Sequence, residues 1–161
     1  GLFCGVAAGT STITYSLGSG CITTTVVTVN ALPGAISGSF SLCQGGTTTI
    51  SSTPGGGTWL SDNPTIAAIG VGTGIITTGA GSGTATVSYT LATGCRRTAV
   101  VTVNPLPTAI TGTTSVCAGQ CTTLNSTPAG GTWSSVSAAV GTINPATGVF
   151  CGMGRARHIR G

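Results

Sequence analysis

The sequence predicts an all-β protein built of short strands and tight turns. Its 161 residues include 32 threonines and 16 serines. Threonine favours strands, and serine is tolerated in turns. A further 28 glycines and 7 prolines interrupt the chain at short intervals, as turn residues do between strands. Apolar residues spaced at the helical period are scarce, so we expect no helix.

The strand pattern is clearest in the middle of the chain. "TATVSYTL" at 84–91 alternates, with one face made of Ala85, Val87, Tyr89 and Leu91. "RTAVVTV" at 97–103 is predicted to be its hairpin partner, with one face made of Ala99, Val101 and Val103. The other predicted strands are 34–42, 47–52, 57–61, 66–70 and 74–78. About seven strands are expected of an immunoglobulin-like sandwich.

An internal repeat organises these strands. "VVTVNALPGAISG" at 26–38 recurs as "VVTVNPLPTAITG" at 100–112, a shift of 74 residues. The same shift relates Tyr15 to Tyr89, Cys21 to Cys95, Cys43 to Cys117 and Trp59 to Trp133. A period of about 74 residues is typical of a small sandwich domain in tandem. We expect both tryptophans and both tyrosines to lie in sandwich cores; a carbohydrate-stacking role for the tryptophans is the alternative.

The repeat divides the chain into four parts. Residues 31–104 form a complete repeat, 1–30 hold the closing strands of a preceding one, 105–152 open a further one, and 153–161 are a basic tail outside the pattern. A half sandwich exposes apolar faces and unpaired strand edges. We therefore expect neighbouring copies to complete the terminal repeats head to tail, which produces an open filament. The alternative is that the chain is a slice of a longer covalent array.

The surface has few charges. Only 4 % of residues are charged, and the one acidic residue is Asp62, whereas ordinary domains carry about 25 %. Other copies or attached glycans are expected to cover such a surface. Asn125-Ser126-Thr127 is an N-glycosylation sequon, and the candidate O-linked sites are Thr84, Thr86 and Thr90.

The seven cysteines favour an oxidising, extracellular setting. Cys43 and Cys95 are the two cysteines of the complete repeat, which predicts a disulfide within that domain. The same rule pairs Cys117 with Cys21 of a neighbouring copy. Simple strand counting places the members of each pair at opposite ends of a sandwich, and either a strand switch near Cys43 or bridges between successive domains would remove this conflict. The remaining cysteines are Cys121, Cys151 and Cys4, and Cys121 is expected to pair with Cys151 or with an incoming Cys4, the alternative being a free thiol.

Catalysis is not expected, because acid–base chemistry needs a paired carboxylate, histidine or lysine. Asp62 and His158 are nearly 100 positions apart, and no cofactor motif is present. Cys117 and Cys121 lack the further ligands that a zinc site requires. There is no run of 18 apolar residues to span a membrane. The tail "GRARHIRG" at 154–161 lacks interleaved aromatic residues, so a linker is favoured over nucleic-acid binding.

One family resemblance follows from these segments. "VVTVNPLPTAITGTTSVCAGQCTTLNSTPAGGTW" at 100–133, together with "GVAAGTSTITY" at 5–15 and "GSGTATVSYT" at 81–90, resembles bacterial immunoglobulin-like repeats of the Big-2 kind. Such repeats occur in tandem in large secreted surface adhesins and gliding-type proteins of Bacteroidetes. The resemblance implies a structural or adhesive role at the cell surface and no catalytic residues.

These observations together predict a structural subunit of an extracellular bacterial filament, whose partners are copies of itself and attached glycans. The alternative is a carbohydrate- or surface-binding module of a large adhesin. The filament predicts self-association without a ligand, whereas the module predicts a discrete monomer that binds sugar.

Overall fold

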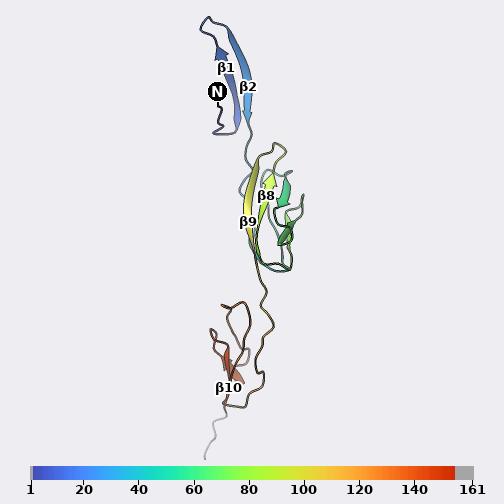
Figure 1. Ribbon diagram of the computed structural model, residues 1–161, viewed down its shortest axis with the longest axis vertical. Helices are drawn as coiled ribbons and strands as arrows, with labels where there is room; N and C mark the ends of the chain where they lie inside the picture. Colours follow the sequence, from blue (N-terminus) through green and yellow to red (C-terminus); the bar gives the residue numbers. More distant parts are fainter. Residues whose placement is uncertain (1, 155–161) are drawn as a thin grey trace, which may run out of the picture. The chain divides into compact units, whose positions relative to one another are not determined.

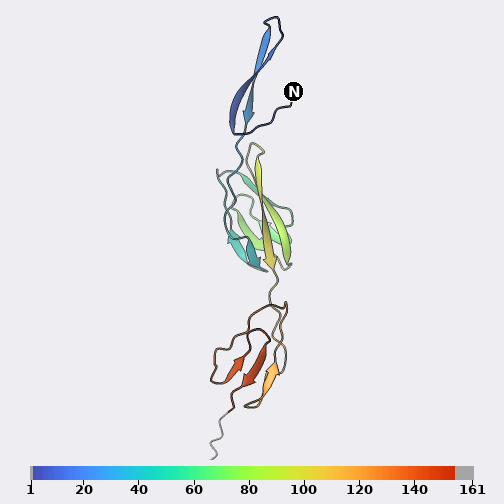
Figure 2. The ribbon, with the colours of Figure 1, turned by 90° about the vertical axis from the view of Figure 1, so that its left-hand side faces the viewer.

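The computed structural model describes residues 2–154, and every regular element in that part of the chain is a β-strand. The chain divides into two compact units, Gly1–Asn104 and Pro105–Gly161. Figures 1 and 2 show the strands in two views. The predicted all-β class is confirmed.

The first unit begins with a hairpin that forms a sheet of its own. Strand β1 (Gly9–Ser16) pairs antiparallel with β2 (Ile22–Val29), and the sheet contains these two strands. It is drawn in blue near the N-terminus in Figure 1. A two-stranded hairpin alone is marginally stable in water.

The rest of the first unit is a sandwich of seven strands. They are β3 (Ser41–Cys43), β4 (Thr47–Thr49), β5 (Thr58–Ser61), β6 (Ala67–Ile69), β7 (Ile75–Thr78), β8 (Gly83–Thr90) and β9 (Arg96–Asn104). One sheet has the order β3-β9-β8-β5 and the other β4-β7-β6. All pairs are antiparallel except β3 with β9. This arrangement is immunoglobulin-like, as the strand count predicts.

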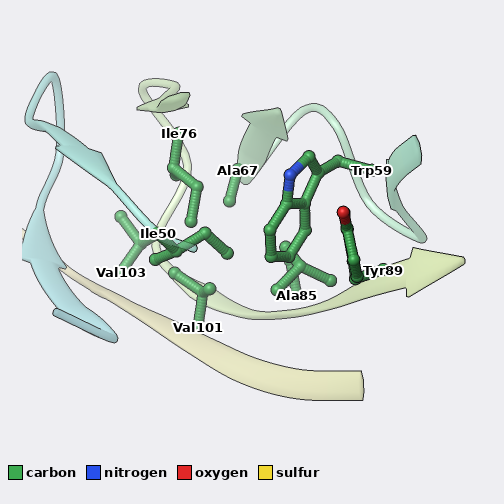
Figure 3. Close-up of a cluster of buried hydrophobic side chains, with 9 residues drawn as sticks. Ile50, Trp59, Ala67, Ile76, Ala85, Tyr89, Val101 and Val103 are labelled. Carbon is green, nitrogen blue, oxygen red and sulfur yellow. The ribbon is translucent and has the colours of Figure 1, made fainter. Parts of the chain in front are cut away.

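The core lies between these two sheets, as Figure 3 shows. Trp59 on β5 packs on Tyr89 of β8, with ring centroids 4.6 Å apart. The faces predicted from the alternation of β8 and β9 are the buried ones. The buried apolar residues are Ile50, Trp59, Ala67, Ile76, Ala85, Val87, Tyr89, Val101 and Val103.

The predicted first strand, 34–42, is longer than the observed one. Ser37 forms an isolated bridge with Ser51, next to β4, whereas Ser41–Cys43 pairs with β9 in the other sheet. Gly38 turns the chain between the two sheets with a φ of 132°, where a side chain would meet Ile50. The strand therefore switches sheets, and only its second part is regular.

The second unit contains one three-stranded sheet in its described part. Its strands are β10 (Cys121–Thr123), β11 (Gly141–Ile143) and β12 (Val149–Gly152), in the order β10-β12-β11. Shifted by 74 residues, they correspond to β4, β6 and β7 of the sandwich. The second unit thus has the counterpart of one sandwich sheet.

Candidate assembly interface

The β1–β2 hairpin has the same register as the β8–β9 hairpin. Gly9 faces Val29 as Gly83 faces Val103, and all eight residue pairs of the two hairpins correspond through the 74-residue shift. The two hairpins therefore have matching backbone pairing. We call residues 9–29 the donor hairpin.

The two hairpins differ in burial. Tyr15 is 66 % exposed, whereas its counterpart Tyr89 is 3 % exposed. Ile13 is 39 % exposed, and its counterpart Val87 is fully buried. The donor hairpin therefore presents to solvent the side chains that a sandwich core contains.

Tyr89 shows what such a tyrosine does in a complete sandwich. Its hydroxyl accepts a hydrogen bond from the Gly57 N–H at 2.8 Å and donates one to the Pro54 carbonyl at 2.9 Å. Its ring packs on Trp59. The "STPGGGTW" segment at 52–59 thus contacts the buried end of the tyrosine. This role was missed at the sequence level, although the recurrence of the segment with the tyrosine could have indicated it.

The second unit lacks the matching four-stranded sheet within its described residues. The counterparts of β5 and β3 are residues 132–135 and 115–117, and neither forms a strand. In the first unit these strands pair with β8 and β9. Within the described residues 105–154, neither segment has a strand partner that corresponds to β8 or β9.

Without that sheet, the apolar side of the second unit is open. Trp133 is only partly buried, whereas Trp59 is 5 % exposed. Ile110 is 60 % exposed, whereas its counterpart Ile36 packs against the core. The tyrosine partners recur here as Pro128 and Gly131, but residues 105–161 contain no tyrosine.

A cavity of about 620 Å³ lies at this position in the second unit. It is lined by Pro128, Gly131 and Trp133, the counterparts of the three residues that contact Tyr89, and by Pro107 and Leu124 among others. The cavity thus lies where the repeat places a tyrosine ring.

The same unit has a second cavity, of about 190 Å³. It is lined by Val116, Leu124 and Phe150, among others. Their counterparts are Leu42, Ile50 and Ile76, which belong to the core that contains Val101 and Val103. The donor hairpin has Val27 and Val29 at the positions of these two valines. We call the open apolar side of residues 105–152, with its two cavities, the acceptor face.

A disulfide links the strands of the acceptor unit. Cys121 on β10 and Cys151 on β12 are register partners and are bonded to each other. This is one of the two pairings that the sequence leaves open for Cys121, and Cys4 is a free, exposed thiol. The counterparts in the sandwich are Thr47 and Thr77, which also face each other but carry no sulfur. The bridge holds together a sheet that has no second sheet to pack against.

The predicted disulfide between Cys43 and Cys95 is wrong. Both residues are free thiols. Cys43 faces Asn104 at the end of β9, and Cys95 precedes the first residue of that strand. The nine residues of β9 separate them by about 30 Å at the usual rise per residue, whereas a disulfide needs Cα atoms within about 7 Å. The sheet switch at Gly38 does not remove the conflict, because Cys43 follows it.

The glycosylation candidates lie on accessible positions. Asn125 is exposed, and its main chain bridges to Thr111. Thr84, Thr86 and Thr90 lie on the face of β8 that points away from the core, where Thr84 is exposed and the other two are half-buried. The arginines of the predicted basic tail, Arg155, Arg157 and Arg160, lie outside the described residues.

The described residues show neither a metal-ligand cluster nor a membrane-spanning helix. Among residues 2–154, no group of three or more histidine, cysteine, aspartate or glutamate side chains is placed to hold a metal ion. No helix in that range is long and apolar enough to cross a membrane.

Comparisons with known proteins find similarity among solved structures. No protein-family model matches the sequence, and no curated protein matches it. Among solved structures, the chain is similar to the C-terminal 282-residue fragment of intimin, crystallised with the intimin-binding domain of the translocated intimin receptor, at 17 % identity and a TM-score of 0.42. The match covers 70 % of this chain and 45 % of the intimin chain, so this chain spans less than half the length of that fragment.

Proposed function

We propose that this chain is a structural subunit of an extracellular filament. In it, the donor hairpin of one copy completes the acceptor face of the preceding copy. Two observations support the proposal together: Tyr15 is exposed, and the second unit has a cavity lined by Pro128, Gly131 and Trp133. The same three positions contact Tyr89 in the complete sandwich of this chain.

Completion is energetically favourable because it removes apolar side chains from water. Each large apolar side chain that becomes fully buried contributes roughly 1.5–3 kcal/mol. Residues 115–117 and 132–135 would gain the strand partners that their counterparts have, and their backbone groups would be paired. The donor and acceptor surfaces differ, so each added copy leaves one of each free and growth continues.

Completion by the same copy is disfavoured by the short connections. Asn30 leads directly into residues 31–33 at one end of β9, while Asn104 leads directly into Pro105 at its other end, about 30 Å away. Completion within one copy would require these short connections to bring the hairpin and the second unit together over the length of the sandwich. Pro105 and Pro107 further restrict the second one, since proline fixes φ.

The setting that we propose is extracellular. The disulfide between Cys121 and Cys151 needs an oxidising compartment to persist. A glycan coat on the threonine-rich faces would supply the hydration that few charges provide.

The competing proposal is a carbohydrate-binding module, and the cavity beside Trp133 favours it as the second candidate. In that case the cavity would bind a sugar ring. Tyr15 would then have no role in filling the cavity.

The test compares two adjacent valines. Val27 corresponds to Val101, which is fully buried in the sandwich, and Val26 corresponds to Val100, which is 56 % exposed. We expect Val27→Asp to abolish filaments in electron micrographs and to leave a monomer in sedimentation, because completion would bury a carboxylate. Val26→Asp should assemble like the parent chain. Discrete parent monomers without any filament would contradict the proposal, as would filaments formed equally by both variants.

A further inference from the structure

Cys43 and Cys95 lie at the two ends of the sandwich, and their counterparts in the repeat are Cys117 and Cys21. Cys43 ends β3 at the downstream end, where the chain leaves the sandwich: it faces Asn104, and the next residue's N–H donates to the Asn104 carbonyl at 3.0 Å. Cys95 lies at the upstream end, where the chain enters, and its Sγ–H donates to the Asn30 carbonyl at 3.8 Å. Each cysteine therefore adjoins an asparagine at a junction.

Those two asparagines are the same position of the repeat. Asn30 ends "VVTVN" at 26–30, and Asn104 ends "VVTVN" at 100–104. In a series of sandwiches, this residue ends one sandwich and begins the connection to the next. The cysteine at the downstream end of one sandwich and the cysteine at the upstream end of the next thus both adjoin one asparagine.

We infer that disulfides link successive sandwiches across each subunit junction of the filament, and this inference rests on the proposed function. A completed sandwich contains Cys117 of one copy at its downstream end and Cys21 of the next copy at its upstream end. Cys117 of the first copy then lies close to Cys95 of the next copy, and both adjoin Asn30 of that next copy. In the same way, Cys43 of the first copy lies close to Cys21 of the next copy, and both adjoin Asn104 of the first copy.

Neighbouring strands lie about 5 Å apart, so Cys43 lies one strand spacing from the main chain at Asn104, and the Cys95 sulfur lies 3.8 Å from the Asn30 carbonyl oxygen. All four thiols are at least partly exposed in the single chain. None has a partner within its own sandwich, because the sandwich separates them by its length. The pairing uses all four and leaves Cys4 as the remaining free thiol.

Each bridge forms by thiol–disulfide exchange with a disulfide oxidant. Two protein thiols are oxidised to one disulfide, and the oxidant's disulfide is reduced to two thiols, which take up the two protons and two electrons. The two copies are joined twice, by bonds that resist detergent. A filament held by strand completion alone would instead separate in detergent.

The test uses two double variants of the full chain in a Cys4→Ser background. The parent should give a ladder of covalent oligomers on a non-reducing denaturing gel, which collapses to monomer with reductant. We expect Cys43→Ser with Cys95→Ser to remove the ladder, because it removes one cysteine from each bridge. Cys21→Ser with Cys43→Ser removes both cysteines of one bridge and should keep the ladder through Cys95 and Cys117.

Pairing of Cys21 with Cys117 across one completed sandwich predicts the reverse result for both variants. That result would overturn the inference, as would a parent filament that dissolves to monomer without reductant. Electron microscopy of the same samples separates this failure from failure of the proposed function: filaments should form in all variants. If the parent forms none, the proposed function fails and the inference fails with it.

Discussion

The β1–β2 and β8–β9 hairpins have the same strand pairing in two different environments. They share all eight register pairs, yet Tyr15 is 66 % exposed and Tyr89 is 3 % exposed. The β8–β9 hairpin lies between β3 and β5 and under a second sheet, whereas the β1–β2 hairpin forms a sheet alone. Local sequence therefore determines hairpin pairing, and the surrounding strands determine whether the apolar face is buried.

The segments around Trp59 and Trp133 give the complementary comparison. Both follow an "STP" turn with a cis proline, and their N–H groups bond to the carbonyls of Val71 and Pro145. Only Thr58–Ser61 is a strand, because only it has β8 as a neighbour. A segment of the same type thus becomes a strand only where a partner strand is present.

The largest effect is expected when a second donor hairpin is added to the same chain. A variant in which Gly152 is followed by a second copy of residues 6–30 should close its own acceptor face. We expect it to remain monomeric under conditions in which the parent polymerises, since no acceptor is left. Sedimentation measures the change, and Trp133 fluorescence should shift to the blue as the indole becomes buried.

A matched fusion checks the specificity of that result. The same fusion carrying Val27→Asp in the added copy should fail to close and should polymerise like the parent, because its own N-terminal hairpin remains intact. If the unmodified fusion also polymerises like the parent, the acceptor face is not the site of growth.

The next largest effect concerns the disulfide of the acceptor unit. Closing a loop over a sequence separation of 30 residues contributes roughly 3–4 kcal/mol through the entropy of the unfolded chain. Cys121→Ser should therefore destabilise the second unit by about that amount and leave the first unit unchanged. Hydrogen exchange, resolved by unit in the monomeric chain, measures both.

The control for this bridge is the variant that lacks both sulfurs. Cys121→Ser with Cys151→Ser should lower the stability of the second unit by as much as Cys121→Ser or Cys151→Ser alone, because the same disulfide is lost in each case. Equal exchange rates in the parent and all three variants would contradict a stabilising role.

A smaller effect is expected from removing the tyrosine hydroxyl. Tyr89→Phe leaves the Gly57 N–H and the Pro54 carbonyl without their partner and should destabilise the sandwich by about 1–3 kcal/mol. Tyr15→Phe should leave the unfolding of the free chain unchanged, because Tyr15 is exposed there. It should instead raise the critical concentration for assembly by about tenfold, which corresponds to about 1.4 kcal/mol.

The effect of a tyrosine variant should depend on whether its hairpin is buried in a sandwich. In the self-closed fusion, Tyr→Phe in the added copy should lower the stability of the second sandwich as Tyr89→Phe lowers that of the first. No effect of Tyr15→Phe on assembly would argue that another group fills the cavity.

Much of this fold follows from sequence periodicity. The alternation of 84–91 and 97–103 predicts which faces of β8 and β9 are buried, because a strand in a sandwich has one apolar side. The repeat likewise predicts the register of the donor hairpin. Strand counting places Cys43 and Cys95 at opposite ends of the sandwich, but the sequence could not decide whether a strand switch near Cys43 brings them together, because that depends on which sheet residues 41–43 join. The contact of Pro54 and Gly57 with Tyr89 was also missed, since main-chain groups make it and only the recurrence of the segment together with the tyrosine indicates it.

The smallest effect is expected from the sequon beside the acceptor face. Asn125 bridges to Thr111 through main-chain N–H and carbonyl groups, at 2.8 and 2.9 Å, which Gln would preserve. Its counterpart Ser51 is exposed in the complete sandwich, so position 125 should stay accessible after completion and accept a glycan. Asn125→Gln should remove the carbohydrate mass at this site from native filaments and change the stability of the second unit by less than about 0.5 kcal/mol. Intact-mass measurement and the critical concentration test the two statements separately; a large rise in critical concentration would mean that the side chain or its glycan contacts the incoming hairpin.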